Sequence, residues 1–285
     1  NIFDIKSPSS IILHPTSING IKTKLLVNES DYVKIGSPIY CDKNNPDAFF
    51  VSTCSGKINK IIFGERRVVK AIHIDNDKKY ESINLDYNVS RESLLNSGLW
   101  NCIRQKPFSK IPKSDCTPKS IFISAMPTEP FAIDLEFLFN NSNHFLQHGI
   151  DVLKKIFNCD INLISNKNSI FKELKNTNHY TFNKLHPAGN VGIQIHHIDP
   201  IKNANDIRCY LSIQDLNRIG QFYSNKDYPI FKTFSVGGNG FYKPAYYKCL
   251  IGTPISDILK NNYENDSRII SGDVLSGIET KKINS

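Results

Sequence analysis

The segment S-L-L-N-S-G-L-W-N-C-I-R-Q-K-P-F-S-K-I-P, residues 93–112, joins two different kinds of sequence and decides how the chain is organised. Ser90 is a suitable N-cap for a short helix, and Gly98 suits its end because a residue without Cβ readily adopts the left-handed conformation. Regular structure cannot continue far beyond Gly98, since the two prolines of the segment lack a backbone donor and fix φ. The apolar run K-S-I-F-I-S-A at 119–125 then predicts a strand that is buried on both faces.

The side chains of this segment are open to two interpretations. In the first, Trp100, Ile103 and Phe108 belong to the hydrophobic core and the cations form a solvated rim. In the second, Trp100 and Phe108 form a docking surface for a partner or an anionic ligand, because aromatic residues and arginine dominate interface energetics. Arg104 and Lys110 would then contribute the charge of that surface.

The composition excludes several classes of protein. With 285 residues, 40% hydrophobic and 22% charged, the chain is typical of a soluble globular protein with two or three small domains. Its apolar runs are far shorter than the roughly 20 residues that span a bilayer, and no signal peptide is visible. The net charge is +8, but the lysines are dispersed and no nucleic-acid-binding motif occurs, so nucleic acid is not an expected partner. Seven scattered cysteines without C-x-x-C spacing predict a reducing compartment and no zinc or iron–sulfur site.

Residues 1–88 are predicted to form a β domain, because short apolar runs alternate with glycine and proline. V-K-I-G-S-P-I at 33–39 and S-G-K-I-N-K-I at 55–61 resemble the turns of a biotinyl/lipoyl-type half-barrel. Lys43 lies roughly where such carriers hold their modified lysine. Residues 44–48 lengthen that turn, however, so Lys43 is not expected to protrude, and a structural or interface module is the better interpretation.

Residues 89–204 are predicted to form an α/β domain. The buried strand, a helix over about 144–157 and a second strand at 161–164 indicate a parallel, right-handed crossover. The loop M-P-T-E-P-F follows the first strand, at the carboxyl end where open α/β sheets bind ligands. Glu129 and Phe131 are therefore candidate site residues, although a solvated loop acid is an equal alternative for Glu129.

The segment L-H-P-A-G-N-V-G-I-Q-I-H-H at 185–197 is the second candidate site. Gly189 and Gly192 allow the backbone to approach another group closely. His186 and His196 belong to a group of three histidines whose spacing matches no zinc pattern, so no metal is expected. Hydrogen-bonded structural or interface histidines remain open, as does a proton-relaying histidine near a redox partner.

Residues 205–285 are predicted to form a small α+β domain. G-G-N-G joins the two strands of a hairpin and does not open a helix, so it is a weak candidate for a phosphate cradle. The predicted elements are a strand at 207–213, a helix at 215–223, hairpin strands at 230–236 and 246–250, a helix begun by Thr253-Pro254, and a strand at 268–272.

One motif is similar to sequences of the NqrA family: S-G-L-W-x-x-x-R-x-x-P-F-S-K-x-P, followed by a strand and A-M-x-T-x-P. Members of that family are subunits of the sodium-translocating NADH:quinone reductases. H-P-A-G-x-x-G-x-x-x-H at 186–196, S-I-Q-D-L at 212–216 and R-I-I-S-G-D-V-L-S-G at 268–277 follow in the family's order. The resemblance covers nearly the whole chain and is weakest over residues 1–30. It departs at Gln194, where the family often has another histidine, and the family extends further at the C-terminus.

The resemblance implies a peripheral subunit on the cytoplasmic face of the bacterial inner membrane, docked to a membrane-embedded subunit of a six-subunit complex. That complex passes electrons from NADH to ubiquinone and exports Na⁺. The subunit is expected to contribute to quinone binding without a catalytic residue of its own, while NADH, FAD, FMN, riboflavin and Fe–S centres belong to other subunits. The candidate quinone- or partner-binding residues are Trp100, Arg104, Phe108, Lys110, Glu129, Phe131, His186, Gly189, Gly192 and His196.

The family's relation in fold to the flavin-binding subunit of complex I implies a Rossmann-like middle and a β-grasp, SLBB-like C-terminal domain. It also leaves an alternative function, a flavin- or NADH-binding dehydrogenase subunit. Loops that bind flavin or dinucleotide phosphates are glycine-rich and lead into a helix N-terminus. No glycine occurs between Leu99 and His148, so the chain is expected to bind neither FMN nor NAD(H).

Overall fold

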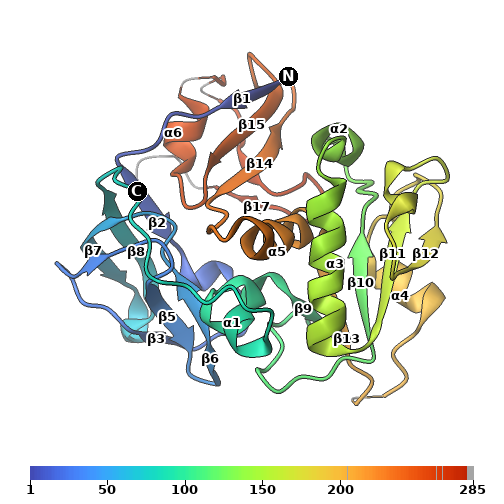
Figure 1. Ribbon diagram of the computed structural model, residues 1–285. Coiled ribbons are helices and arrows are strands. Elements are labelled where there is room, and N and C mark those ends of the chain that lie inside the picture. The colour runs from blue at the N-terminus through green and yellow to red at the C-terminus, as the bar shows by residue number, and fades with distance from the viewer. Residues whose placement is uncertain (204, 261, 265, 281–285) are drawn as a thin grey trace.

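A computed structural model of the protein describes residues 1–203, 205–260, 262–264 and 266–280. The described chain forms three units, which Figure 1 shows mainly in blue, in green to yellow, and in orange; residues 2–4, in blue, belong to the third unit, and the helix at 213–225, in orange, belongs to the second. The first is a β barrel, the second a sheet covered by helices, and the third a small sheet that lies beside both. The mixed α/β class that the sequence predicts is therefore confirmed.

The N-terminal unit packs a four-stranded sheet, in the order β2-β8-β7-β4, against a three-stranded sheet, in the order β3-β5-β6. The strands are short because polar turns interrupt them, and their inward residues Ile39, Ile58 and Ile72 are buried between the sheets. The predicted half-barrel architecture is thus present. Its elements are β2 (Ser10–Leu13), η1 (Pro15–Ser17), β3 (Thr23–Leu25), β4 (Tyr32–Val33), β5 (Pro38–Asp42), β6 (Asn45–Val51), β7 (Gly56–Phe63), η2 (Glu65–Arg67) and β8 (Val69–Asn76).

The turn at Lys43 differs from the prediction. Strands β5 and β6 pair as far as Asp42 and Asn45, so only Lys43 and Asn44 form the turn. The Asp42 carboxylate accepts hydrogen bonds from the backbone N–H groups of Lys22 and Asn44, which tightens the turn. Lys43 is therefore exposed at the tip of a two-residue hairpin, and the expectation of a long loop is wrong.

The connection between the first two units begins with the predicted short helix. The Ser90 side chain accepts a hydrogen bond from the Ser93 N–H at 3.0 Å, as an N-cap does. Gly98 has a φ of 76°, and a Cβ there would lie 2.9 Å from the carbonyl oxygen of Phe49. Gly98 is thus required both by its backbone conformation and by the close packing on the barrel. The connection contains α1 (Arg91–Asn96), η3 (Leu99–Cys102) and β9 (Arg104–Lys106).

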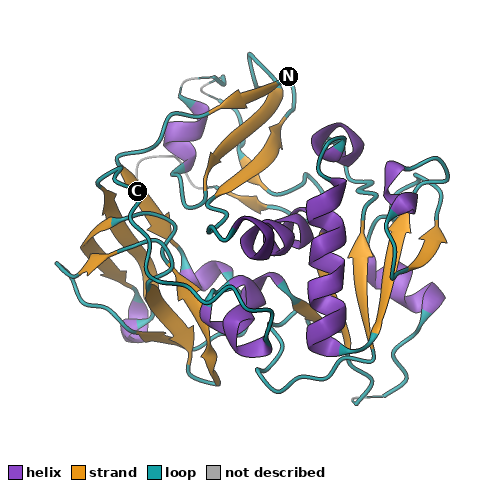
Figure 2. Ribbon diagram, in the orientation of Figure 1, coloured by secondary structure: helices purple, strands orange, loops and turns teal. Residues whose placement is uncertain are grey.

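The central unit is a five-stranded sheet in the order β12-β11-β10-β13-β9, in which only β9 is antiparallel to its neighbour. Helices α3 and α5 cover one face and α4 the other (Figure 2). Ile121 and Ile123 point to the first face and Phe122 to the second, which explains why β10 is apolar throughout. The remaining elements are β10 (Ser120–Ser124), α2 (Leu135–Phe139), α3 (Asn143–Phe157), β11 (Asp160–Ser165), η4 (Ile170–Glu173), β12 (Asn178–Thr181), α4 (Val191–Ile198), β13 (Arg208–Ser212) and α5 (Ile213–Asn225).

Two glycines allow α3 and α5 to touch along their backbones. A Cβ on Gly220 would lie 1.8 Å from the carbonyl oxygen of Phe145. A Cβ on Gly149 would lie 2.5 Å from the carbonyl oxygen of Leu216. The close crossing of these helices therefore depends on the absence of side chains at both positions.

The C-terminal unit is built on the sheet β1-β15-β14, in which the predicted hairpin β14–β15 is extended by the N-terminal strand. Strand β1 pairs in parallel with β15, an association of the two ends of the chain that the sequence did not predict. The Thr253 side chain bonds back to the Leu250 carbonyl, so Pro254, and not Thr253, precedes the first helical residue. The elements are β1 (Ile2–Asp4), β14 (Phe231–Val236), β15 (Ala245–Leu250), α6 (Ile255–Leu259), β16 (Ile270–Ser271) and β17 (Ile278–Glu279).

The boundary between the second and third units also differs from the prediction, which divided the chain into residues 1–88, 89–204 and 205–285. Strand β13 pairs in parallel with β10 over its whole length, and α5 packs on α3. Both elements therefore belong to the central unit, which extends to Asn225. The local sequence did not reveal this because an apolar strand shows no preference for the sheet before or after it.

Candidate functional site at the carboxyl edge of the central sheet

The central sheet has a topological switch point between β10 and β13. The chain leaves β10 towards β11 on one side, whereas β13 lies on the other side of β10. The connections after β10 and after β13 therefore diverge at the carboxyl edge, where open α/β sheets form their ligand sites. Glu129 and Phe131 lie in the loop after β10, where the sequence placed them.

Two loops of this edge are joined through Thr128. Its hydroxyl accepts a hydrogen bond from the Gly189 N–H at 3.0 Å and lies 3.3 Å from Nδ1 of His186. A Cβ on Gly189 would lie 2.7 Å from the Met126 carbonyl oxygen, so this glycine serves the contact between the loops. The Glu129 carboxylate accepts the Thr128 N–H at 3.0 Å and so stabilises its own loop. The structure thus brings three predicted residues, Glu129, His186 and Gly189, to one place.

Beside this edge, a cavity of about 530 Å³ separates the loop after β10 from the C-terminal sheet. Phe131 is 56% exposed there, with a φ of 61°, and its carbonyl oxygen accepts a hydrogen bond from Ser235 at 2.6 Å. The Tyr246 hydroxyl accepts a hydrogen bond from the Asp134 N–H at 3.0 Å. The cavity is lined mainly by apolar and aromatic side chains, among them Phe3, Phe131, Val236, Pro244 and Tyr246.

Trp100 does not belong to any surface site. The side chain is fully buried, its Nε1 donates to the Pro112 carbonyl oxygen at 2.9 Å, and its ring packs on Phe157 of α3. The guanidinium of Arg91 lies 5.2 Å from the centre of the indole ring. The interpretation of Trp100 as a docking residue is therefore wrong, because the turn after α1 points it into the core between α1 and α3.

The other residues of that segment divide between the two interpretations. Arg104 is half-buried and donates from Nη1 to the carbonyl oxygens of Asn101 and Ile103, so it is folded back on its own turn. Phe108 is 73% exposed, which contradicts a core role. Lys110 is also exposed, and its Nζ lies 5.6 Å from the centre of the Phe108 ring. Of this segment, only Phe108 and Lys110 remain candidates for a docking surface.

Helix α4 separates the remaining predicted residues. Gly192 is in its first turn, where a Cβ would meet nothing closer than the Lys106 side chain at 4.0 Å. His196 lies about one turn further along the helix and is exposed, away from His186. Buried Gln194 donates to the Ser124 hydroxyl and the Ala188 carbonyl, and so ties the helix to β10. Within the described residues, no group of three or more His, Cys, Asp or Glu side chains is placed to hold a metal ion.

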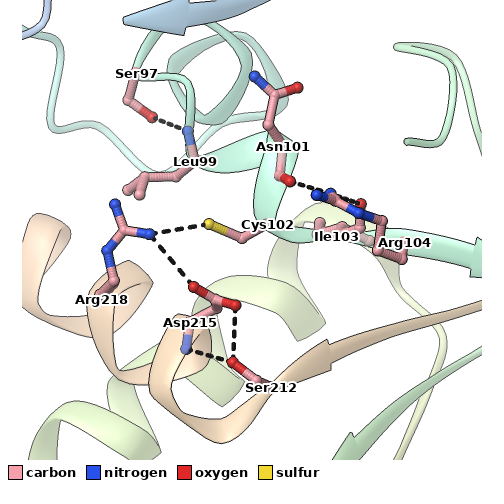
Figure 3. Close-up of polar contacts among 9 residues, drawn as sticks. All are labelled: Ser97, Leu99, Asn101, Cys102, Ile103, Arg104, Ser212, Asp215 and Arg218. Atoms are coloured by element: carbon pink, nitrogen blue, oxygen red, sulfur yellow. Dashed lines mark hydrogen bonds and ion pairs between the residues drawn. The ribbon is translucent and has the colours of Figure 1, made fainter. Parts of the chain in front are cut away.

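A polar cluster at the start of α5 was not predicted from the sequence. Arg218 donates from Nη1 to the Asp215 carboxylate at 3.3 Å and lies 3.4 Å from the Cys102 sulfur (Figure 3). Burial alone would raise the pKa of the Asp215 carboxyl, but Lys232 and Arg218 hold it below its usual value. The D-x-x-R spacing on a helix beginning with Ser212 as N-cap is the one signal that could have revealed this pair.

Comparison with known proteins accounts for all three units. Family models match the chain consecutively: an NqrA N-terminal barrel-sandwich hybrid domain over residues 1–77, an NqrA second α/β domain over 85–227 and an NqrA C-terminal domain over 233–282. The second model alone covers half of the chain. The chain belongs to the NqrA family. The limits of this second model agree with the structure in assigning β13 and α5 to the central unit.

Several NqrA subunits of Na(+)-translocating NADH-quinone reductases are similar along most of the chain. The protein from Yersinia pestis bv. Antiqua is 32% identical over 272 residues, which is 90% of this chain and 60% of the relative. The Glaesserella parasuis protein is 33% identical over 273 residues, 90% of this chain and 61% of its own length. The protein from Neisseria meningitidis serogroup B is 30% identical over 293 residues, which is 98% of this chain and 65% of the relative. The chain thus spans less than two-thirds of these NqrA relatives. None of the helices that the structure describes is long and apolar enough to cross a membrane.

Proposed function

We propose that this NqrA-family chain acts as a peripheral subunit of a Na⁺-translocating NADH:quinone reductase. It docks on a membrane-embedded subunit from the cytoplasmic face, contributes to quinone binding and carries no redox cofactor of its own. The observation that supports this best is the match of three NqrA domain models in order along a chain with the corresponding three units. NADH, FAD, FMN, riboflavin and Fe–S chemistry would then belong to the other subunits.

The cavity beside Phe131 has the chemistry that a quinone headgroup requires. A quinone ring is flat and largely apolar, and its two carbonyl oxygens accept hydrogen bonds. Phe3 and Phe131 offer aromatic surface in a cavity of suitable size for a small ligand. Because the Tyr246 oxygen accepts from the Asp134 N–H, the hydroxyl proton of Tyr246 is available to a quinone carbonyl.

A binding experiment with short-chain ubiquinone and the isolated chain tests this site. Tyr246→Phe removes one neutral hydrogen bond, worth about 1 kcal/mol, and should weaken binding about fivefold. Phe131→Ala should weaken it further by removing stacking area. Phe63→Ala is the matched control, since Phe63 is 47% exposed in the N-terminal unit, and it should leave the affinity unchanged. Equal losses in Tyr246→Phe and Phe63→Ala would refute this location.

Docking is assigned to the exposed turn that carries Phe108 and Lys110. An exposed aromatic side chain beside a cation has the composition of an interface hot spot, for which truncation typically costs about 2 kcal/mol or more. Phe108→Ser should lower the amount of chain recovered with the assembled membrane complex, without changing the melting temperature of the isolated chain. Phe63→Ser is the control, and normal assembly of Phe108→Ser would show that the turn is not at the interface.

A further inference from the structure

We propose a second ligand site, for a small molecule that carries a carboxylate or a phosphate monoester on an apolar body. The site is a cavity of about 410 Å³ between α5, the linker at 227–230 and the C-terminal sheet. It shares no lining residue with the cavity beside Phe131, so this proposal does not depend on quinone binding.

The charge of the cavity favours an anion. Arg218, Lys232 and Lys248 line it, whereas Asp227 is the one carboxylate among its described lining residues. Asp215 lies outside the lining and pairs with Arg218. Cations gathered in one concave site repel one another, and an anionic ligand relieves that repulsion.

The orientation of Arg218 leaves donors for such a ligand. One terminal nitrogen, Nη1, is occupied by Asp215 and Cys102, and Figure 3 shows the other pointing away from both. Nε has almost no accessible surface, so only the second terminal nitrogen can face the cavity, on the side where Tyr228 lines it. A terminal guanidinium nitrogen carries two N–H donors, which can bind a carboxylate or phosphate oxygen.

A neutral polar group and an apolar wall complete the site. Asn217 is 8% exposed and lines the cavity, where it adds a neutral polar side chain. Leu138, Phe139 and Ile230 supply the apolar surface that covers the body of the ligand.

Calorimetry on the whole chain at low ionic strength tests the proposal with three probes. These are 4-hydroxybenzoate, phenyl phosphate and the neutral 4-hydroxybenzyl alcohol, which has the ring and hydroxyl of the first without its charge. At least one anion should bind saturably with a Kd of about 1 mM or below, and the preferred anion distinguishes carboxylate from phosphate. The alcohol should bind at least tenfold more weakly than its carboxylate counterpart.

Variants localise the binding. Arg218→Gln should abolish it and Lys232→Gln should weaken it at least fivefold, whereas Lys155→Gln, an exposed control on α3, should change nothing. If Arg218→Gln fails to fold because Asp215 loses its partner, Lys232→Gln and Lys248→Gln still decide the question. The proposal would be overturned if the alcohol bound as tightly as 4-hydroxybenzoate, or if neither anion bound at 10 mM probe concentration (about 2.7 kcal/mol). It would also be overturned if Lys155→Gln weakened binding as much as Lys232→Gln does.

Discussion

Replacing Gly220 by alanine should separate the two helices on which the central unit depends. The new Cβ would lie 1.8 Å from the Phe145 carbonyl oxygen, whereas ordinary contacts begin at 3.4 Å. Both atoms belong to or are attached directly to helix backbones, so no side-chain rotation relieves the overlap. Helices α3 and α5 must therefore move apart locally by about 1.6 Å, or one of them must distort.

The expected cost follows from the packing that this movement removes. A gap of 0.5–1 Å already loses about a quarter to a half of the dispersion energy between facing atoms, and overpacking of a core typically costs about 1–3 kcal/mol. Because the clash at Gly220 involves backbone, we take the upper value. Alanine regains about 1 kcal/mol of helix propensity over glycine, so the net loss is about 2 kcal/mol, or about 4–8 °C in melting temperature.

Urea unfolding followed by tryptophan fluorescence measures this loss. Trp100 is the only tryptophan, and its ring packs on Phe157 of α3, so it reports on the central unit. Gly192→Ala is the matched control, because it also places alanine in a helix but meets nothing closer than 4.0 Å. Its free energy of unfolding should not fall and should rise by up to about 1 kcal/mol, because the helix-propensity gain of alanine applies there without a clash. An unchanged midpoint for Gly220→Ala, or an equal change in the control, would refute the reasoning.

Four further outcomes are expected. Asp199→Asn removes the carboxylate that lies 2.6 Å from Nε of the fully buried Arg208. The free energy of unfolding in urea should fall by about 2–3 kcal/mol, which is less than the loss on breaking a fully buried ion pair, because Asp199 is partly exposed. Burial opposes ionisation of Asp199, but Arg208 and Ser120 hold its pKa below the usual value. The ion pair therefore stabilises the fold above about pH 4, and this stabilisation is lost as the pH falls through the lower pKa of the folded state. The acid unfolding curve of Asp199→Asn should accordingly be shallower than that of the parent below pH 4. Burial raises the pKa of Cys102 to about 11, so mass mapping at pH 8 should find it unalkylated unless the chain is first denatured. Finally, titration should show no FMN or NADH binding tighter than about 1 mM, roughly 4 kcal/mol, and micromolar binding would favour the dehydrogenase alternative.

Local patterns predicted the helices and strands well where the physical cause is local. The N-cap at Ser90, the left-handed Gly98 and the doubly buried strand at 120–124 follow from single residues or from a short apolar run. The Lys43 turn did not, because Asp42 closes it by accepting two backbone N–H groups, one of them from Lys22, just before strand β3. A side chain that replaces backbone hydrogen bonds in this way leaves no compositional signal.

Burial of Trp100 shows the corresponding limit for the candidate site. An aromatic side chain among cations has the same composition at an interface as in a core, and only its partners, Phe157 and Pro112, decide between the two. By contrast, Glu129 could be placed at the carboxyl edge beforehand, because it follows a predicted strand of an open α/β sheet. The contact of its loop with the loop of His186 was not predicted, since strand β12, which leads to His186, was not recognised in the sequence. His196 could not be placed either, since its position depends on how far α4 carries the chain away from that edge.

Both proposed cavities have the C-terminal sheet as one wall, and that sheet is positioned by contacts from the whole chain. Strand β1 supplies its parallel edge, the loop after β10 bonds to it through Ser235 and Tyr246, and the barrel reaches the end of β15 through Thr53, whose hydroxyl donates to the Ile251 carbonyl at 2.6 Å. A ligand in either cavity contacts this sheet and the central unit at once, so its binding energy favours the arrangement in which the two are docked. The carboxyl edge alone therefore does not define a site in this fold: the residues that complete each cavity come from both ends of the chain, which only the folded arrangement brings together.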